Sequence, residues 1–203
     1  MKIIKHFKTV SKHRHYVRIY CWKLGLYKQG LFHDLSKFSP IEFFESVKYY
    51  DGKISPIDVC KKKNGYSKAW LHHKGRNPHH YEYWQDNFDN GGVPLLMPKK
   101  YALELVADYI GAGKAYMKDS FSYKAEYEWW TNKRKTPLAM HEANINFIER
   151  SLYNLMKAEN SESFDFNGEV DAEFNKIPNY YDESVESYKK MQIIKEYLKE
   201  ERK

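Results

Sequence analysis

The stretch Pro98-Lys-Lys-Tyr-Ala-Leu-Glu-Leu-Val-Ala-Asp-Tyr-Ile-Gly-Ala-Gly-Lys-Ala-Tyr-Met117 carries the strongest helical pattern in the chain. Spacings of three and four residues define one predicted face, which comprises Tyr101, Leu105, Asp108, Ala112 and Ala115. Proline favours the start of a helix, so we expect this helix to begin at Pro98. An unpaired carboxylate is costly to bury, so Asp108 on this apolar face requires a cation or a salt-bridge partner.

Turn and capping signals divide the rest of the chain into further helices, with little of the period-2 alternation typical of strands. They predict a helix from Thr9 or Ser11 through Tyr27, a second carrying His33 and Asp34, helices beginning at Pro40 and Pro56, and a short helix over 66–73. A further helix is predicted to begin at Asn77-Pro78, with His79 and His80 in its first turn, and another at Thr136-Pro137. Ser39-Pro40-Ile41-Glu42 matches a capping box, in which Glu42 would bond back to the helix start.

The same signals predict loops over 61–65, 86–98 and 159–182, and a final amphipathic helix over 183–203. The predicted fold class is therefore all-α. We expect one helical domain over residues 1–158, followed by an acidic loop and a C-terminal amphipathic helix over 159–203. That last helix either covers the domain or meets a partner, so a homodimer is one expected assembly.

Composition indicates a compact protein in a reducing compartment. The chain has 203 residues, and its two cysteines, Cys21 and Cys60, lie far apart without a CxxC pattern. No apolar run approaches the roughly 20 residues that span a bilayer, and the N-terminus lacks the apolar segment of a signal peptide. We therefore expect a cytoplasmic protein without a membrane partner.

The net charge of +7 is uneven: residues 1–80 carry +12 and residues 81–203 carry −5. A positive field around a site would attract anionic substrates such as nucleotides or other phosphate esters. The same charge also fits a solvated basic surface or a nucleic-acid partner.

The histidines gather in the basic part of the chain. His33 and Asp34 are adjacent in Gly30-Leu-Phe-His-Asp-Leu-Ser-Lys-Phe38, where they could bind one metal ion from neighbouring positions. His13 precedes this pair, and the doublets His72-His73 and His79-His80 lie between it and Asp108. We expect His6 and His15 to be exposed, and His141 to be a core or surface residue.

This order of residues resembles the HD superfamily of metal-dependent phosphohydrolases, and His-Asp-Leu-Ser-Lys matches its His-Asp-x-x-Lys form. The resemblance implies an HD-like helical bundle in which His13, His33, Asp34 and Asp108 bind a first metal. The doublet residues His72, His73, His79 and His80 would serve a second metal, with Asp34 bridging both. Adjacent helical residues diverge by about 100°, so one histidine of each doublet is expected to bind, and we favour His73 and His79.

A closer resemblance is to an uncharacterised family of short bacterial and phage proteins that carries no established activity. It covers roughly residues 10–120. Two segments carry it: Gly30-Leu-Phe-His-Asp-Leu-Ser-Lys-Phe-Ser-Pro40 and Ala69-Trp-Leu-His-His-Lys-Gly-Arg-Asn-Pro-His-His-Tyr-Glu-Tyr-Trp84.

Several other residues are candidates for substrate contacts or for support of the metal ligands. Lys37 would share the face of His33 and Asp34 on a helix and could hold a substrate phosphate. Lys74 and Arg76 could grip phosphate oxygens or be solvated, and Tyr83 and Trp84 could stack a base or pack in the core. Glu104 could orient a ligand histidine or pair with a lysine, and Glu82 could add a carboxylate or stabilise a helix start.

The reaction favoured by these residues is hydrolysis of a phosphomonoester or phosphodiester, with Asp34 and Lys37 as catalytic residues and a metal-activated water as nucleophile. Histidine-rich coordination suits one or two ions of Mn²⁺, Fe²⁺, Co²⁺ or Ni²⁺, with Mg²⁺ as an alternative. The expected substrate is a nucleotide. Two other functions remain open: a di-iron oxygenase on the same scaffold, and a basic nucleotide- or nucleic-acid-binding module with a structural metal.

Overall fold

The computed structural model describes residues 1–174 of the chain. Their α-helices are α1 (Lys2–Lys23), α2 (Tyr27–Phe32), α3 (Pro40–Tyr49), α4 (Pro56–Asn64), α5 (Lys68–Lys74), α6 (Lys99–Met117), α7 (Tyr123–Lys133), α8 (Glu142–Ala158) and α9 (Phe166–Phe174). A short antiparallel hairpin joins β1 (Gln85–Asp86) to β2 (Val93–Pro94). The predicted all-α class is confirmed.

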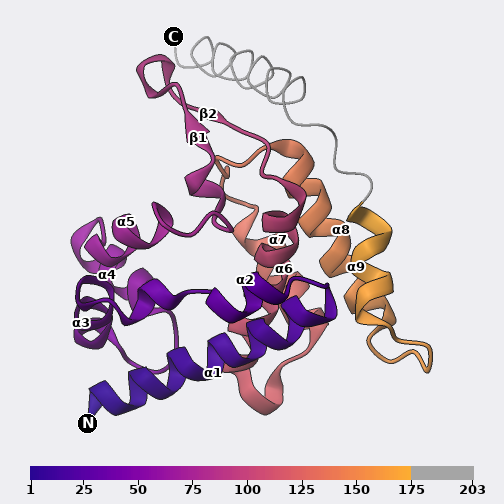
Figure 1. Ribbon diagram of the computed structural model, residues 1–203, viewed down its shortest axis with the longest axis horizontal. Coiled ribbons are helices and arrows are strands. Elements are labelled where there is room, and N and C mark those ends of the chain that lie inside the picture. Colours follow the sequence, from indigo (N-terminus) through magenta and orange to yellow (C-terminus); the bar gives the residue numbers. More distant parts are fainter. Residues whose placement is uncertain (175–203) are drawn as a thin grey trace.

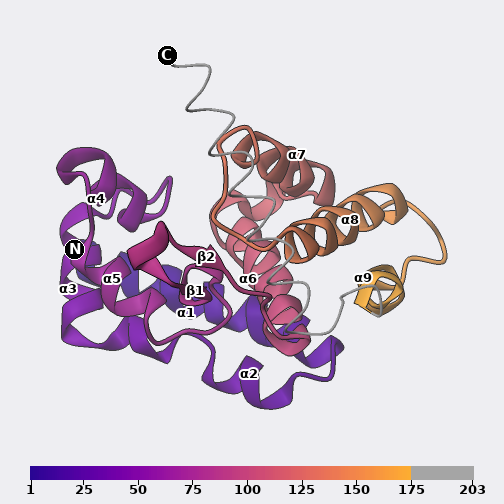
Figure 2. The ribbon, with the colours of Figure 1, turned by 90° about the horizontal axis from the view of Figure 1, so that it is seen from above.

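Helix α6 forms the centre of the molecule, with α1 packed along it (Figures 1 and 2). All residues of α6 from Ala102 to Gly111 are buried. The sequence predicted one apolar face, whereas the helix is enclosed on all sides over this stretch. Gly111 allows the two helices to approach closely, because a Cβ at this position would lie 2.4 Å from Cγ2 of Val17. His13 precedes Val17 by one turn and Asp108 precedes Gly111 by about one turn, so the close crossing brings these two side chains together.

The remaining helices lie on two sides of the α1–α6 pair. Helices α3, α4 and α5 pack together on one side, and α7, α8 and α9 pack on the other (Figure 2). The second side contains most of the large apolar core, including Trp130, Ile148, Leu152 and Leu155. The first side carries residues that approach α6 through polar side chains, and the candidate site lies there.

Several helix boundaries differ from the sequence prediction. α1 begins at Lys2 and ends at Lys23, α4 continues through the lysines predicted to form a turn, and no element was predicted for the segment that forms α7. α8 begins at Glu142 rather than after Thr136-Pro137, because Nδ1 of His141 accepts a hydrogen bond from the backbone N–H of Ala143 and caps the helix. His141 is buried, within the prediction of a core or surface residue.

The predicted loop over 159–182 is wrong for residues 166–174, which form α9 and place Phe166 and Val170 in the core. The remainder of that prediction and the helix predicted over 183–203 lie outside the described residues. Within 86–98, the predicted loop contains the β1–β2 hairpin. The starts of α3, α4 and α6 agree with their proline signals.

Both cysteines are buried and free. Over residues 1–174, none of the helices combines the length and the apolar character needed to cross a membrane.

Candidate metal centre

Asp34 lies in a turn rather than on a helix. α2 ends at Phe32, and Asp34 adopts the left-handed conformation, with φ of 54° and ψ of 27°. The expectation that one helix carries His33 and Asp34 is therefore wrong. Aspartate tolerates this backbone better than most residues, and such conformations persist where surrounding contacts hold them. The turn directs the Asp34 carboxylate into the interior, where it is fully buried.

Four side chains converge on a first cluster, here called group 1: His13, His33, Asp34 and Asp108. Nε2 of His13 lies 3.2 Å from Oδ2 of Asp34 and 3.2 Å from Oδ1 of Asp108. Nε2 of His33 lies 3.3 Å and 3.1 Å from the same two oxygens. Group 1 therefore presents two imidazole nitrogens and two carboxylate oxygens that could hold a metal ion.

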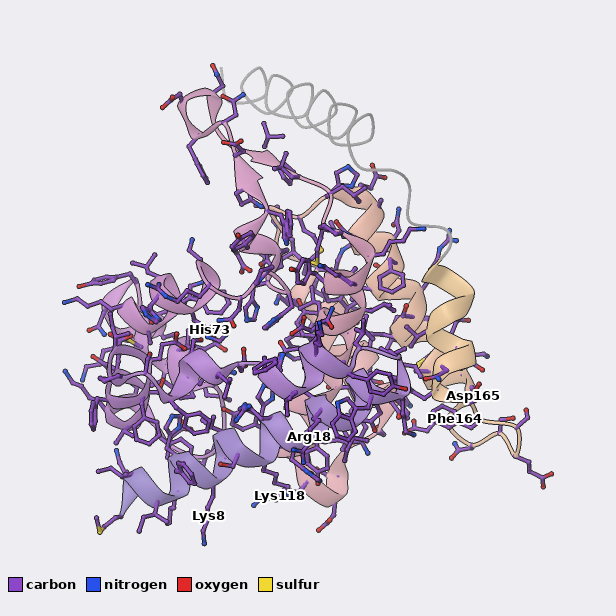
Figure 3. All side chains as sticks on the ribbon, in the orientation of Figure 1. Lys8, Arg18, His73, Lys118, Phe164 and Asp165 are labelled. Carbon is purple, nitrogen blue, oxygen red and sulfur yellow. The ribbon has the colours of Figure 1, made fainter. Side chains whose placement is uncertain are left out.

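The other oxygen of Asp34 belongs to a second cluster, group 2, which comprises Asp34, His73, His79 and His80. Nε2 of His73 lies 3.2 Å from Oδ1 of Asp34, and Nε2 of His79 lies 3.4 Å from it. His73 and His80 face each other with their Nε2 atoms 2.9 Å apart. Figure 3 labels His73 on α5, above α1. Asp34 thus directs Oδ2 toward group 1 and Oδ1 toward group 2.

Glu104 holds the outer nitrogens of two of these histidines. Its Oε1 lies 2.9 Å from Nδ1 of His33 and 3.1 Å from Nδ1 of His79. A carboxylate on one ring nitrogen fixes the orientation of the imidazole and leaves the other nitrogen available as a ligand. The arrangement matches the orienting role that the sequence suggested for Glu104.

Glu42 contacts the Nδ1 atoms of His72 and His73 at the end of α5 and so orients both rings. Sequence reasoning missed this role. Oε2 of Glu42 lies 2.8 Å from Nδ1 of His73, and its Oε1 lies 2.5 Å from Nδ1 of His72. We expected Glu42 to complete a capping box with Ser39, whereas α3 has no side-chain cap hydrogen bond. The only sequence signal was a carboxylate two residues after a proline, which does not distinguish a cap from a partner for histidine.

The two histidine doublets behave differently. His72 bonds Glu42 and lies outside both groups, so the structure does not bring it to the site. His79 and His80 both belong to group 2, because Asn77-Pro78 opens a turn and not the predicted helix. Neighbouring residues in such a turn need not diverge as helical neighbours do, which removes the reason for choosing one histidine of this doublet.

Electrostatics at the centre favour charged carboxylates. Burial alone would raise the pKa of Asp34, but His33, Lys37 and His73 hold it well below its usual range. Burial would lower the pKa of His33, whereas Asp34, Asp108 and Glu104 raise it well above the ordinary value. Burial, together with His79 and His73, lowers the pKa of His80, which keeps its imidazole neutral as a ligand nitrogen must be.

Lys37 lies beside the Asp34 carboxylate, as its position in the sequence suggested. Its Nζ is 2.5 Å from Oδ2 of Asp34, and its side chain keeps a quarter of its surface exposed. Burial would lower its pKa, but Asp34 and Asp108 raise the pKa to about 12, so the ammonium stays charged. It sits in a 3₁₀ turn, η1 (Leu35–Phe38), rather than on a shared α-helix.

The other predicted contacts lie outside both groups. Arg76 is exposed and donates to the carbonyl of His72 at 3.4 Å, and Lys74 is half-buried. Tyr83 is exposed, and Trp84 packs against the core and donates to the carbonyl of Pro78 at 2.6 Å. Glu82 is half-buried and belongs to neither group among the described residues.

Lys133 is another half-buried cation in this region, and sequence reasoning gave it no role. It reaches from α7 to within 5.1 Å of the ring centroid of Tyr109, which follows Asp108, and within 5.6 Å of that of Tyr81, which follows His80. No pattern in the sequence connects 133 to these positions, because α7 approaches them only in the folded chain.

His6 corrects another expectation, since it is buried rather than exposed. Its ring packs against those of Phe43 and Tyr50, with centroids 5.2 and 5.3 Å away, and it belongs to neither group. His15 is exposed, as expected.

The residues of both groups fit a divalent cation. Oδ1 of Asp34 and Nε2 of His79 lie 3.4 Å apart and are buried without a hydrogen bond of regular geometry, although buried polar atoms normally make one. Ligand atoms about 2.1 Å from one ion lie roughly 3.0–3.4 Å apart at octahedral or tetrahedral angles. The separations of 2.9–3.4 Å in groups 1 and 2 are close to that range.

The fold and these clusters define an all-α protein with buried histidine–carboxylate groups that could hold a metal ion. The chain belongs to a family described as a family of unknown function (DUF5662), whose model matches residues 2–154. That match includes every residue of groups 1 and 2. No curated protein matches the chain, and no solved structure does.

Proposed function

We propose that this protein is a metal-dependent phosphohydrolase that acts on a nucleotide or a related phosphate ester. The observation that carries the proposal is the division of the Asp34 carboxylate, with one oxygen in each group and Lys37 beside it. A carboxylate placed in this way can bridge two ions. The order of His13, His33-Asp34 and Asp108, which resembles the HD superfamily, supports the same proposal.

In this proposal the first metal is held by His13, His33, Asp34 and Asp108, and the second by Asp34, His73, His79 and His80. Bound divalent ions supply Lewis-acid activation of water and charge neutralisation at the phosphoryl group. Glu104 and Glu42 keep the imidazole rings oriented, so that the ligand nitrogens need not reorganise during turnover.

Lys37 supplies the fixed positive charge of the proposed site. Its ammonium is charged at neutral pH and partly exposed, so it can leave one of its three donors for a substrate phosphate oxygen while bonding Asp34. A contact of this kind that strengthens as negative charge develops would lower the barrier. The charge of +12 over residues 1–80 favours an anionic substrate in general, a class that includes nucleotides and other phosphate esters.

A di-iron oxygenase is the second candidate, favoured by the histidine-rich composition of group 2. Three imidazoles with one carboxylate suit iron as well as manganese. The fixed charge of Lys37 favours the hydrolase, because an uncharged substrate has no need of it.

The experiment is to purify the chain without chelators, measure bound Mn, Fe, Co and Ni, and screen phosphomonoesters, phosphodiesters and nucleotides with each metal. The expected result is close to two metal equivalents per chain and phosphate release that chelation abolishes and metal restores. Oxygen consumption that requires reduced iron, without phosphate release, would replace the hydrolase with the oxygenase. Metal near one equivalent that is unchanged by His73→Ala/His79→Ala would remove the second site.

A further inference from the structure

The outward surface of α1 is strongly basic. The helix contains seven Lys and Arg residues and no Asp or Glu, and the first acidic residue of the chain is Asp34. Its inward positions are taken by His6, Val10, His13, Val17, Tyr20 and Cys21. The five lysines of the helix are exposed, and Arg14 and Arg18 are half-buried on its flank. Figure 3 shows Lys8 projecting from the underside of α1, with Arg18 farther along the same helix. A helix of 22 residues is about 33 Å long, so the charge extends over a considerable length.

A groove lies between this helix and α2. It has a volume of about 120 Å³ and is lined by Ser11, Arg14, His15, Arg18, Gly30 and Leu31. Arg14 is anchored there, because its Nε donates to the carbonyl of His33 at 2.7 Å and its Nη2 to that of Leu31 at 3.1 Å. Nη2 of Arg18 contacts Nδ1 of His15 at 3.2 Å. Two guanidinium groups are thus held at a concave surface with donors left over.

Aromatic rings stand at both ends of the α1–α2 groove. The guanidinium of Arg14 lies 5.4 Å from the ring centroid of Phe38, and that of Arg18 lies 5.6 Å from that of Trp22. Trp22 in turn lies 6.4 Å from the ring of Tyr27, and both rings are exposed. The order along the surface is therefore aromatic ring, arginine, arginine, aromatic rings.

We propose that the α1–α2 groove binds single-stranded nucleic acid. Grooves that hold single strands combine cations for the phosphates with aromatic rings on which unpaired bases stack. The charge is complementary, because residues 1–33 contain no carboxylate that could neutralise it within the groove. An anionic membrane surface is flat and would not reach into a concave groove, and a duplex offers no unpaired base to Trp22 or Tyr27. The proposal does not rest on the metal centre, to which the groove residues do not belong.

The test measures the fluorescence anisotropy of a labelled single-stranded 20-mer titrated with the full chain. Three or four phosphate contacts should weaken the affinity roughly 20- to 50-fold between 50 and 200 mM salt. A duplex of the same sequence should bind at least fivefold more weakly, because it cannot stack on the exposed rings. Equal or tighter binding of the duplex would overturn the proposal.

The decisive variant is Lys12→Gln/Arg18→Gln, which removes Arg18 from the groove together with Lys12, an exposed cation of α1 outside the groove lining, and leaves Arg14 with its backbone contacts. It should weaken single-strand binding at least tenfold and flatten the salt dependence by about two contacts. The matched control, Lys124→Gln/Lys157→Gln, removes two exposed cations from α7 and α8 and should stay within twofold of the unmodified chain. Unchanged affinity in the groove variant would overturn the proposal.

A second variant, Tyr27→Ser, tests stacking at a side chain that is 65% exposed. It should weaken single-strand binding about fivefold or more, and it remains informative if the double variant fails to fold. Unchanged affinity for Tyr27→Ser would contradict the stacking. Co-sedimentation with phosphatidylserine vesicles, in the absence of oligonucleotide binding, would assign the face to a membrane surface instead.

Discussion

Two buried histidines, His6 and His141, lie outside groups 1 and 2. They differ from the buried histidines of the groups in their partners, not in their burial. His33 and His6 are both almost fully enclosed. His33 faces three carboxylates, whereas His6 packs between aromatic rings with its Nδ1 unpaired. His141 is also buried and caps α8. Burial of a histidine therefore does not mark a site by itself, and what distinguishes His33, His73 and His79 is a carboxylate at each ring nitrogen.

The pKa values separate the same residues. Burial on its own would lower the pKa of His33, His73 and His6 alike, but nearby carboxylates raise the pKa of His33 and His73 above the usual value. His6 has no such neighbour, and burial together with the charge of Lys37 lowers its pKa to about 4. The carboxylates around His33 and His73 thus favour a positive charge on those rings, whereas the surroundings of His6 disfavour one.

The largest effect is expected at Asp34. Asp34→Ala removes the carboxylate common to both groups, so it should abolish turnover and lower total bound metal. Asp108→Ala removes a residue of group 1 alone and should lose about half the metal. Elemental analysis beside Asp119→Ala, an exposed control on the surface, checks both. Full activity in a folded Asp34→Ala protein would show that the assigned centre is wrong.

Lys37→Met should produce the next largest change. The variant keeps the length of the side chain but deletes the charge beside Asp34. A charged contact made mainly in the transition state is worth a few kcal/mol, so kcat on a phosphate ester should fall by roughly 10²-fold or more. Metal content should not fall. Wild-type rates with metal and fold intact would make Lys37 a surface residue without a phosphate-binding role.

Glu42→Gln should weaken metal binding by roughly 10- to 100-fold at group 2 alone, because an amide cannot accept from two imidazoles as a carboxylate does. Glu45→Gln is the matched control on the same helix, since Glu45 bonds Ser67 and the backbone of Ala69 instead of a histidine. Metal titration of each variant gives the comparison. Equal affinities for both variants would mean that Glu42 only shapes the end of α5.

Substitution of His6 is expected to leave the metal centre unchanged and to affect only the stability of the fold. The pKa of His6, about 4 in the folded state, lies below the unfolded value of 6.5, so stability is lost as pH falls through this window. At about 1.4 kcal/mol per unit, the loss approaches 3 kcal/mol at pH 4. His6→Phe should remove this part of the acid sensitivity, while the exposed His15→Gln should not. Urea unfolding at pH 7.0 and 4.5 measures the difference, and a loss of bound metal in His6→Phe would contradict the comparison.

Sequence reasoning succeeded where the signal was local. Proline signals placed the starts of α3, α4 and α6, and the apolar surroundings of Asp108 indicated that this carboxylate is buried with partners. Sequence reasoning failed where one local pattern is compatible with two structural roles. Glu42 fits a helix cap and also a histidine partner, and only the position of α5 decides between them.

The amino-acid sequence by itself determined the helical class and the residue types that meet at the centre, because periodicity, caps and ligand chemistry are properties of short segments. Only the tertiary structure decided how those residues are used. The left-handed turn at Asp34 divides its two oxygens between the groups, and the α1–α6 crossing at Gly111 brings His13 to Asp108. These arrangements depend on contacts between segments far apart in the chain, and packing in three dimensions sets such contacts without leaving a local pattern.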